Sequence, residues 1–365
     1  PEFSGEWKMC TIGELTTKVG SGVTPRGGEA VYKTEGHPFV RSQNVGLGNL
    51  LLDDIAFIDE ETHLRQKNTE LQFNDVLLNI TGASIGRSAL VDKQIVGGNV
   101  NQHVCIIRTK ENLVPSFICS FLLSNYGQRQ IDSFQAGGNR QGLNFEQIKS
   151  IKITIPSKDE QIKIAKLLRA IDERIATQNK IIDKLQSLIK GVAQNVARNN
   201  KPNIRLSECL ECSSSTLQES DVCKNGTYPV YGANGIVGYI DNYNTEKEAV
   251  YIIKDGSGVG TVSYVTGKCS ATGTLNTLQA KEGYSLQYLY YMLKVFNFEP
   301  YKTGMAIPHI YFKDYGKAKI FCTSYTEQLK YVGLLSAIDN KLSAEQSILT
   351  DLSLQKQYLL RQMFI

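Results

Sequence analysis

Two stretches of the chain share one pattern of hydrophobic and polar positions. They are residues 160–197 and 327–365, and a constant shift of 167 residues aligns them. Neither stretch contains proline, and apolar residues recur at positions a and d of a heptad in both. A period of this kind over so many residues predicts two helices much longer than those of an ordinary globular core. Because a repeat of this kind outranks other signals, we interpret the chain as two copies of one unit.

The a and d positions predict that the two helices pair with each other as a coiled coil. Gln178 and Glu345 are the polar members of the two seams, and they occupy the same repeat position, as expected of residues that set the register. The second globular segment joins the end of the first helix to the start of the second, so paired helices must run antiparallel, with a globular domain at each end. The alternative, in which each helix packs only on its own domain, is less favoured because one small domain cannot cover 38 helical residues. The predicted seam consists of Leu168, Ile171, Ile175, Gln178, Ile182 and Leu185 in the first helix, and of Leu335, Ile338, Leu342, Glu345, Leu349 and Leu352 in the second.

The rest of the chain predicts two α+β domains of similar design. Short β-type runs alternate with glycine-rich turns in both, and the first domain contains one predicted helix at about residues 116–134. Residues 80–86 parallel residues 253–260, and residues 137–142 parallel residues 303–309. The predicted boundaries are 1–157 for the first domain, 158–199 for the first helix, 200–323 for the second domain and 324–365 for the second helix.

The charge of the chain is nearly balanced except in the first long helix. The formal net charge is +4, which is too small to indicate a general nucleic-acid binder. Residues 158–198 carry nine basic and five acidic side chains, whereas residues 325–365 carry four of each. Any binding of DNA must therefore depend on local patches or on phosphate contacts supplied by partners.

The motifs of common enzyme classes are missing from the sequence. It contains no GxxxxGK[ST] loop, no GxSxG turn and no HExxH helix, and its four histidines are dispersed. Cys209 and Cys212 form half of a zinc motif without an evident fourth ligand, so ordinary thiols are favoured over structural zinc. We expect a non-catalytic protein with no metal or cofactor of its own. Lacking a long apolar run and an evident export signal, it is expected to be soluble and cytoplasmic.

Several strings, taken in order, resemble the specificity (S) subunit of type I restriction-modification systems. They include Trp7-Lys8, Pro38-Phe39-Val40-Arg41, Asp75-Val76-Leu77-Leu78, Thr81-Gly82-Ala83-Ser84-Ile85-Gly86 and Asn101-Gln102-His103-Val104. Glu160-Gln161, followed by Ile164-Ala165 and Leu168, begins the first long helix, and its second copy begins the other. The second domain departs from this pattern, because Asp255-Gly256-Ser257-Gly258 replaces the TGAS string.

The resemblance implies two α+β target recognition domains separated by spacer helices, each domain reading one half of a bipartite double-stranded DNA target. It also implies two methyltransferase subunits docked on the helices and restriction subunits in the complex. S-adenosylmethionine, ATP and magnesium are then expected on those partners and not on this chain.

Polar loop residues are the candidates for contacts with base edges, where arginine pairs with guanine and asparagine or glutamine with adenine. For each of them, the alternative is a solvated or turn-stabilising role. For the whole chain, the alternative is a coiled-coil scaffold that binds protein partners without reading DNA. The candidates are Arg41, Gln43, Asn44, Ser84, Arg87, Asn139, Arg140 and Gln141 in the first domain, and Asn234, Lys254, Ser257, Lys302, Thr303 and His309 in the second.

Overall fold

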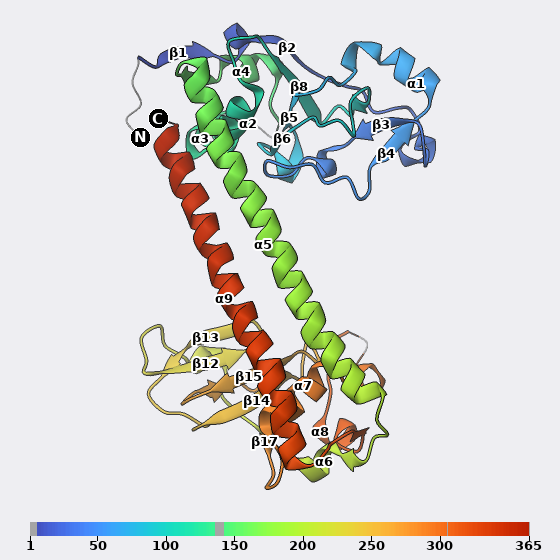
Figure 1. Ribbon diagram of the computed structural model, residues 1–365, viewed down its shortest axis with the longest axis vertical. Helices are drawn as coiled ribbons and strands as arrows, with labels where there is room; N and C mark the ends of the chain where they lie inside the picture. The colour runs from blue at the N-terminus through green and yellow to red at the C-terminus, as the bar shows by residue number, and fades with distance from the viewer. Residues whose placement is uncertain (1–5, 136–141, 305, 365) are drawn as a thin grey trace. The chain divides into compact units, whose positions relative to one another are not determined.

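The computed structural model describes residues 6–135, 142–304 and 306–364. It divides into two compact units, the first formed by residues 1–177 with 349–365 and the second by residues 178–348. Each unit contains one α+β domain and a segment of each long helix (Figure 1). The predicted fold class, two α+β domains with two long antiparallel helices, is confirmed.

The first domain is built on two small sheets. One sheet has the strand order β2-β8-β5-β6 with antiparallel pairs throughout, and the other has the order β4-β3-β7, in which β3 and β7 are parallel. A separate pair, β1 with β9, leads into the first long helix. The strands are β1 (Lys8–Thr11), β2 (Thr16–Ser21), β3 (His37–Val40), β4 (Ala56–Ile58), β5 (Val76–Asn79), β6 (Ser88–Leu90), β7 (Asn99–Val100), β8 (Val104–Thr109) and β9 (Lys152–Ile155).

Four short α-helices lie in the described residues of the first domain. They are α1 (Glu60–Arg65), α2 (Pro115–Leu123), α3 (Asn125–Ser133) and α4 (Phe145–Ser150). The single helix predicted at residues 116–134 is therefore two helices, separated at Ser124. Its hydroxyl donates to the carbonyl oxygen of Phe121 over 2.6 Å and accepts from the backbone N–H of Gly127 over 3.2 Å. Helix α2 ends and helix α3 begins at Ser124, because serine is a favourable helix N-cap.

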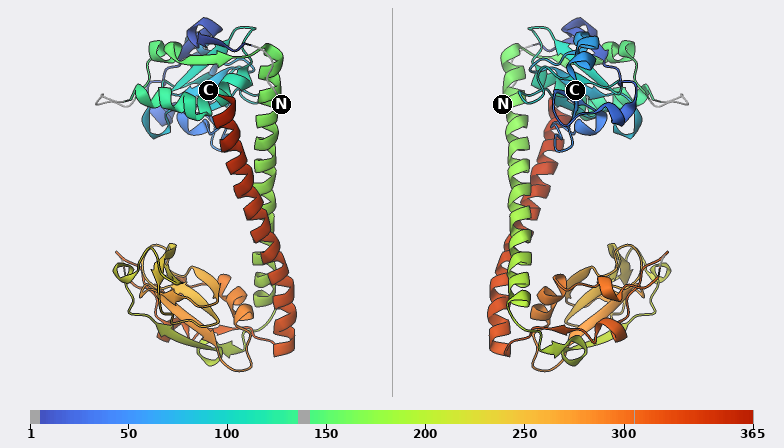
Figure 2. Two further views of the ribbon diagram at one scale, coloured as in Figure 1. Left: turned by 90° about the vertical axis from the view of Figure 1, so that its left-hand side faces the viewer. Right: turned by 90° about the vertical axis from the view of Figure 1, so that its right-hand side faces the viewer.

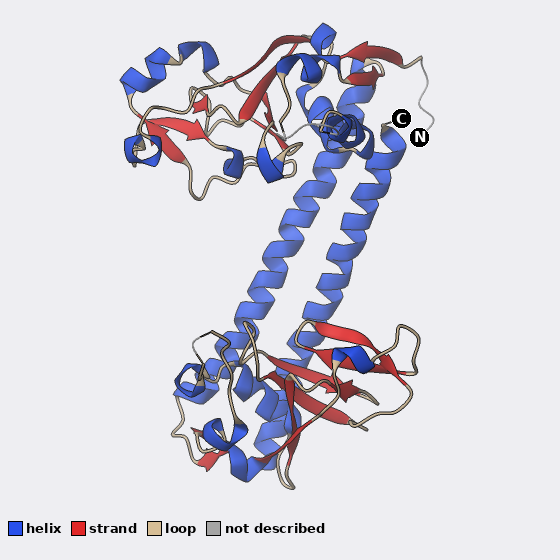
Figure 3. Ribbon diagram, turned by 180° about the vertical axis from the view of Figure 1, so that it is seen from behind, coloured by secondary structure: helices blue, strands red, loops and turns tan. Residues whose placement is uncertain are grey.

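The second domain repeats the topology of the first. Its sheets have the orders β11-β17-β14-β15 and β13-β12-β16, and again only the β12–β16 pair is parallel among these strands. Figure 3 shows the strands of both domains in red. The strands are β10 (Ile204–Arg205), β11 (Leu210–Ser214), β12 (Tyr228–Gly232), β13 (Gly235–Ile240), β14 (Glu248–Ile253), β15 (Val262–Thr266), β16 (Ser270–Ala271), β17 (Leu275–Ala280) and β18 (Lys319–Ile320), and the short helices are α6 (Leu206–Cys209), α7 (Leu286–Lys294) and α8 (Phe312–Tyr315).

The two long helices are α5 (Lys158–Arg198) and α9 (Tyr325–Met363). In the first unit, the end of α9 enters the core of the domain, where Phe364 lies 5.2 Å from Phe117 and 5.8 Å from Phe121 between ring centroids. Both views of Figure 2 show this end of α9 beside the first domain. Leu168 of α5 belongs to the same core cluster. Later in α5, Asp172 forms an ion pair with Lys356, which lies earlier in α9. The helices are therefore antiparallel in this unit.

In the second unit, the polar seam residues meet each other. The Gln178 side-chain amide donates to the Glu345 carboxylate and, over 3.0 Å, to the Glu345 backbone carbonyl oxygen. Lys341 forms an ion pair with the same carboxylate. The pKa of Glu345 is held below its ordinary value, first by Lys341 and then by the amide of Gln178. Two polar side chains thus satisfy each other inside an apolar seam, as a register-setting pair requires.

The other predicted seam residues lie along the same strip. Leu168, Ile171, Ile182, Leu335, Leu342 and Leu352 are buried, and Ile175, Leu185, Ile338 and Leu349 are half-buried. No helix in the described part of the chain is long and apolar enough to span a membrane.

Candidate DNA interface

Three candidate residues of the first domain converge on one carboxylate, that of Asp54. Arg41 donates through Nη2 to the Asp54 carbonyl oxygen over 2.6 Å, and its guanidinium lies over the ring of Tyr32 at 5.4 Å. Gln43 donates to one carboxylate oxygen of Asp54, and Asn44 donates to the other over 2.9 Å. Asn44 is fully buried, whereas Gln43 is exposed. The structure therefore brings these residues together in a tightly bonded loop, of which Gln43 offers the most accessible side chain.

Asn79 joins this loop to the next candidate loop. Its side-chain amide nitrogen donates to the Ser42 carbonyl oxygen over 2.8 Å and to the Ser84 hydroxyl over 3.1 Å. Arg87 follows Ser84, is exposed, and has no side-chain partner among the described residues. Residues 41–44 and 84–87 therefore form one connected polar surface, held together by a buried strand residue.

The remaining candidates of the first domain, Asn139, Arg140 and Gln141, lie outside the described residues. The residue that follows them, Gly142, forms a bridge with Thr81, and the next, Leu143, donates its N–H to the Ile80 carbonyl oxygen over 2.9 Å. Gly142 and Leu143 are thus held beside the Thr81–Ser84 turn. The candidates themselves stay a prediction.

In the second domain, five of the six candidates meet at the matching place. Asp255 forms a bridge with His309, just as Thr81 does with Gly142. Thr303 and His309 exchange backbone hydrogen bonds of 2.9 and 2.8 Å, and the N–H of Gly256 donates to Pro308 over 2.9 Å.

These bonds gather the residues Lys254, Ser257, Lys302, Thr303 and His309. Of these, Lys302 is engaged by Glu299 at 2.5 Å. Asn234 stands apart from the group, in the exposed turn between β12 and β13.

In each unit, one buried glutamine connects the domain to its long helix. The sequence motifs alone do not assign these two glutamines a role. Gln161 accepts from the N–H of Val114 over 2.9 Å and donates to the Pro156 carbonyl oxygen over 3.1 Å. Gln328 accepts from the N–H of Ser285 over 2.8 Å and donates to the Thr323 carbonyl oxygen over 2.8 Å. Each is only 1% exposed. The 167-residue shift, which aligns the two glutamines, is the signal that could have found them.

No metal-binding cluster is present in residues 6–135, 142–304 and 306–364. No three histidine, cysteine or acidic side chains lie close enough there to hold a metal. Burial raises the pKa of the Cys209 thiol to about 12 and that of Cys212 to about 11. Both cysteines are free.

The family model for the type I restriction modification DNA specificity domain matches the chain twice, at residues 4–187 and 202–353. This chain belongs to that family. The two matches contain the two α+β domains, each with much of one long helix. They identify the repeat as two DNA specificity domains in tandem, and the protein as a non-catalytic specificity subunit.

Named relatives agree with this assignment. The chain is 25% identical over 320 residues to a protein of Mycoplasma genitalium described as a type I specificity subunit, covering 80% of this chain and 81% of the relative. It is 22% identical over 202 residues to the specificity subunit of the EcoKI type I restriction enzyme of Escherichia coli, covering 52% of this chain and 41% of the relative.

Solved structures show the same fold. The crystal structure of a type I restriction-modification S subunit from Mycoplasma genitalium matches with a TM-score of 0.68 and 19% identity, covering 99% of this chain and 96% of that one. A chain from work on complex assembly and conformational transition of the type I restriction-modification system matches with a TM-score of 0.56 and 16% identity, covering 99% and 98%.

Proposed function

We propose that this chain is the DNA-reading and assembly subunit of a type I restriction-modification complex. Each domain reads one half of a bipartite double-stranded target, and the paired helices set the spacing between the halves. One observation supports this above the others: two domains of one topology present different polar residues from corresponding loops. A protein that reads one sequence twice would keep those side chains, whereas a reader of two half-sites changes them.

The candidate loops have the chemistry for reading base edges. In the first domain the exposed side chains of Gln43 and Arg87 belong to one connected surface, and in the second the exposed Thr303 lies beside the half-buried His309. A bidentate contact of such a side chain with a base is worth about 1–3 kcal/mol of discrimination. The near-neutral charge of both domains means that partners must supply part of the phosphate binding.

The outer faces of the long helices are suited to docking partner subunits. Leu167 and Ile181 of α5 are exposed, and so are Leu334 and Ile348 of α9, which match them under the 167-residue shift. The two members of each pair lie two heptads apart on one face of their helix. Two equivalent apolar stripes suit two copies of one partner, and we assign them to two methyltransferase subunits.

The complex also contains restriction subunits. S-adenosylmethionine is bound by the methyltransferase subunits, and ATP and magnesium by the restriction subunits. This chain selects the DNA site for both the methyltransferase and the restriction subunits.

The test is methylome sequencing of cells that carry this subunit with its methyltransferase. Arg140→Ala should relax or abolish reading of one half-site, and His309→Ala should do so at the other half-site, each by the loss of about 1–3 kcal/mol of discrimination. Lys180→Ala, an exposed residue of α5, is the control and leaves both half-sites readable. Loss of both half-sites in either domain variant contradicts the assignment of one half to each domain.

A mobility-shift assay with and without the methyltransferase tests the scaffold alternative. A bipartite DNA site bound under at least one condition supports the proposal. If no such site is bound under either condition, the chain is a coiled-coil scaffold that binds proteins only.

A further inference from the structure

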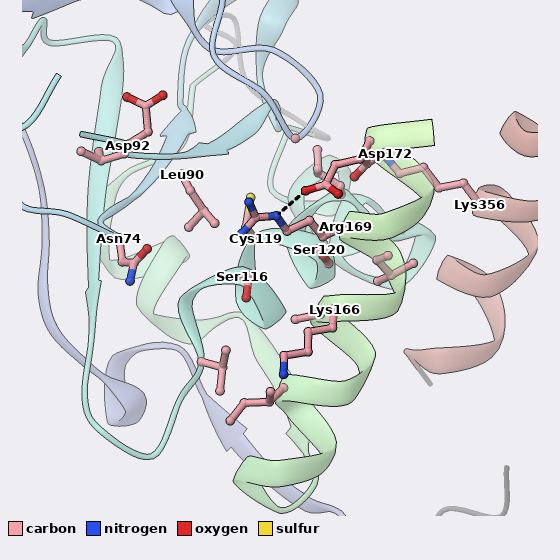
Figure 4. A pocket seen from close by; sticks show the side chains of 18 of the residues that line it. Asn74, Leu90, Asp92, Ser116, Cys119, Ser120, Lys166, Arg169, Asp172 and Lys356 are labelled. Atoms are coloured by element: carbon pink, nitrogen blue, oxygen red, sulfur yellow. Dashed lines mark hydrogen bonds and ion pairs between the residues drawn. The ribbon is translucent and has the colours of Figure 1, made fainter. Parts of the chain in front are cut away.

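The first unit contains a groove of about 760 Å³ between its domain and the start of α5. The α2 residues Ser116, Cys119 and Ser120 form one wall, and Lys166, Arg169 and Asp172 of α5 form another (Figure 4). Most of the lining surface is apolar, including Leu90 and Leu123. Phe73, at the rim, is exposed.

The second unit has an equivalent junction between its domain and its long helix, and the helix residues of the two junctions can be matched one by one. Helices α2 and α7 both have nine residues, and each N-cap N–H donates to the equivalent buried glutamine. Counting from these caps, Ser116 matches Gln287, Cys119 matches Tyr290 and Ser120 matches Tyr291. The 167-residue shift matches Asp172 with Asp339.

In the second unit, tyrosines occupy the position that is open in the first. Tyr291 is 0% exposed, and its hydroxyl donates to the Asp339 carboxylate over 2.7 Å. Tyr290 packs on it, with 5.0 Å between ring centroids. The small side chains Cys119 and Ser120 leave this volume empty in the first unit. Asp172 there is bonded by Lys356 at 2.5 Å, and its side chain remains 41% exposed.

The charged side chains of the groove indicate which charge its occupant carries. Arg169 is paired with Glu173, and Lys356 is paired with Asp172. Lys166 is exposed and has no ion-pair partner among the described residues. The α9 positions that match Lys166 and Arg169 are Gly333 and Ser336, so part of the basic excess of α5 belongs to this groove.

From this comparison, we propose that the groove binds a segment of a partner chain that presents a tyrosine next to an acidic residue. The ring fills the volume that Tyr291 fills in the second unit, its hydroxyl donates to Asp172, and the acidic residue pairs with Lys166. The identity of the partner as a methyltransferase subunit rests on the proposed function. The second unit provides the same contacts internally, so the groove adds to the equivalent apolar stripes one contact that only the first unit offers to its partner.

The first experiment uses the full chain and the peptide acetyl-Glu-Tyr-Glu-amide as the probe, followed by NMR shifts of the Leu90, Leu123 and Ile162 methyl groups. Shifts at millimolar peptide are expected in the wild type and are lost in Ser120→Tyr, which fills the groove as Tyr291 does. Lys166→Glu weakens binding at least several-fold, while the control Lys180→Glu, the same charge change on the same helix, does not. Peptide shifts that survive unchanged in both Ser120→Tyr and Lys166→Glu overturn the proposal.

The second experiment titrates the methyltransferase subunit into each variant by calorimetry. Ser120→Tyr and Lys166→Glu should each weaken one of two binding events by about tenfold or more, as expected for the loss of an interface anchor. Equal affinity in the wild type and Lys166→Glu overturns the assignment of the partner, and so does self-association of the wild type that Ser120→Tyr abolishes. The peptide experiment needs neither DNA nor methyltransferase, so its result stands apart from any failure of the proposed function.

Discussion

The two domains have one topology but fasten their candidate loops by different means. In the first domain a strand side chain, Asn79, joins two loops through its amide. In the second domain a further backbone bridge, between Thr303 and His309, lies beside the Asp255–His309 bridge that matches Thr81–Gly142 in the first. The sheet orders are nevertheless the same. The difference teaches that the sheets and helices carry the fold, so the loops are free to present different chemistry.

A second contrast lies where each domain meets its long helix. The second unit closes this place with Tyr290 and Tyr291, whereas the first leaves a groove lined by Cys119 and Ser120. The buried glutamine at the helix start is common to both units. One part of the junction is therefore structural in both copies, and the other part has diverged.

The largest expected effect comes from making the second unit resemble the first. Tyr291→Ser removes a fully buried ring and should cost about 3–5 kcal/mol of unfolding free energy, as large-to-small changes of buried aromatic residues do. Hydrogen exchange measured on peptides from α7 and β14 would report this loss, because it resolves the two units separately.

Tyr291→Phe is the matched control, since it removes only the hydroxyl that donates to Asp339. Its cost should be about 1.5–3 kcal/mol, the range for hydrogen bonds to charged groups. If Tyr291→Ser lowers the unfolding free energy by less than Tyr291→Phe does, the ring does not have the packing role assigned to it.

An intermediate effect is expected at the two buried glutamines, and it should be nearly equal in the two units. Gln161→Leu removes the acceptor of the part-buried Val114 N–H, and Gln328→Leu removes that of the Ser285 N–H. An unsatisfied buried group costs about 1–3 kcal/mol. Unit-resolved hydrogen exchange of both variants is the measurement. A large loss in one unit with no loss in the other would show that the shared junction is not equivalent.

The smallest expected effect concerns the polar seam pair and depends on pH. The folded-state pKa of Glu345 lies below its ordinary value of 4.5, so its stabilising contribution is present above that pH and is lost as the pH falls through the lowered pKa. Glu345→Gln removes this titration and makes the repeat positions 178 and 345 identical. Thermal unfolding of both proteins over pH should show the wild type losing its advantage in acid. A stability difference that stays constant down to pH values well below 4.5 would contradict the prediction.

Much of the architecture was predictable because it depends on patterns that are local in the sequence. The heptad spacing predicted both long helices, and the connection between them predicted their antiparallel pairing. The Gln178–Glu345 contact is the direct consequence. The break at Ser124 was missed because apolar periodicity continues across it, and the capping bonds that make it are visible only in three dimensions.

The candidate site was predictable by region and less so by residue. The internal repeat aligned Thr81 and Gly142 with Asp255 and His309 by region, and each of these pairs forms a backbone bridge, while their contact with DNA stays a prediction. Whether a polar side chain in such a loop faces solvent depends on partners far away in the sequence. Asn44 is buried where it bonds to Asp54, ten residues later in the chain. Asn79 was not a candidate because its position in the sequence predicts a strand, although its side chain bonds to the candidate loop.

The tandem repeat, the two long helices, their antiparallel direction and the family follow from the sequence alone, because periodicity and register are properties of the chain. Only the tertiary structure decided which polar residues hold loops together and which remain exposed. It alone revealed that Ser120 faces a groove where Tyr291 fills the equivalent volume. Packing of this kind depends on the side chains that distant segments bring to one place, and no local pattern records it.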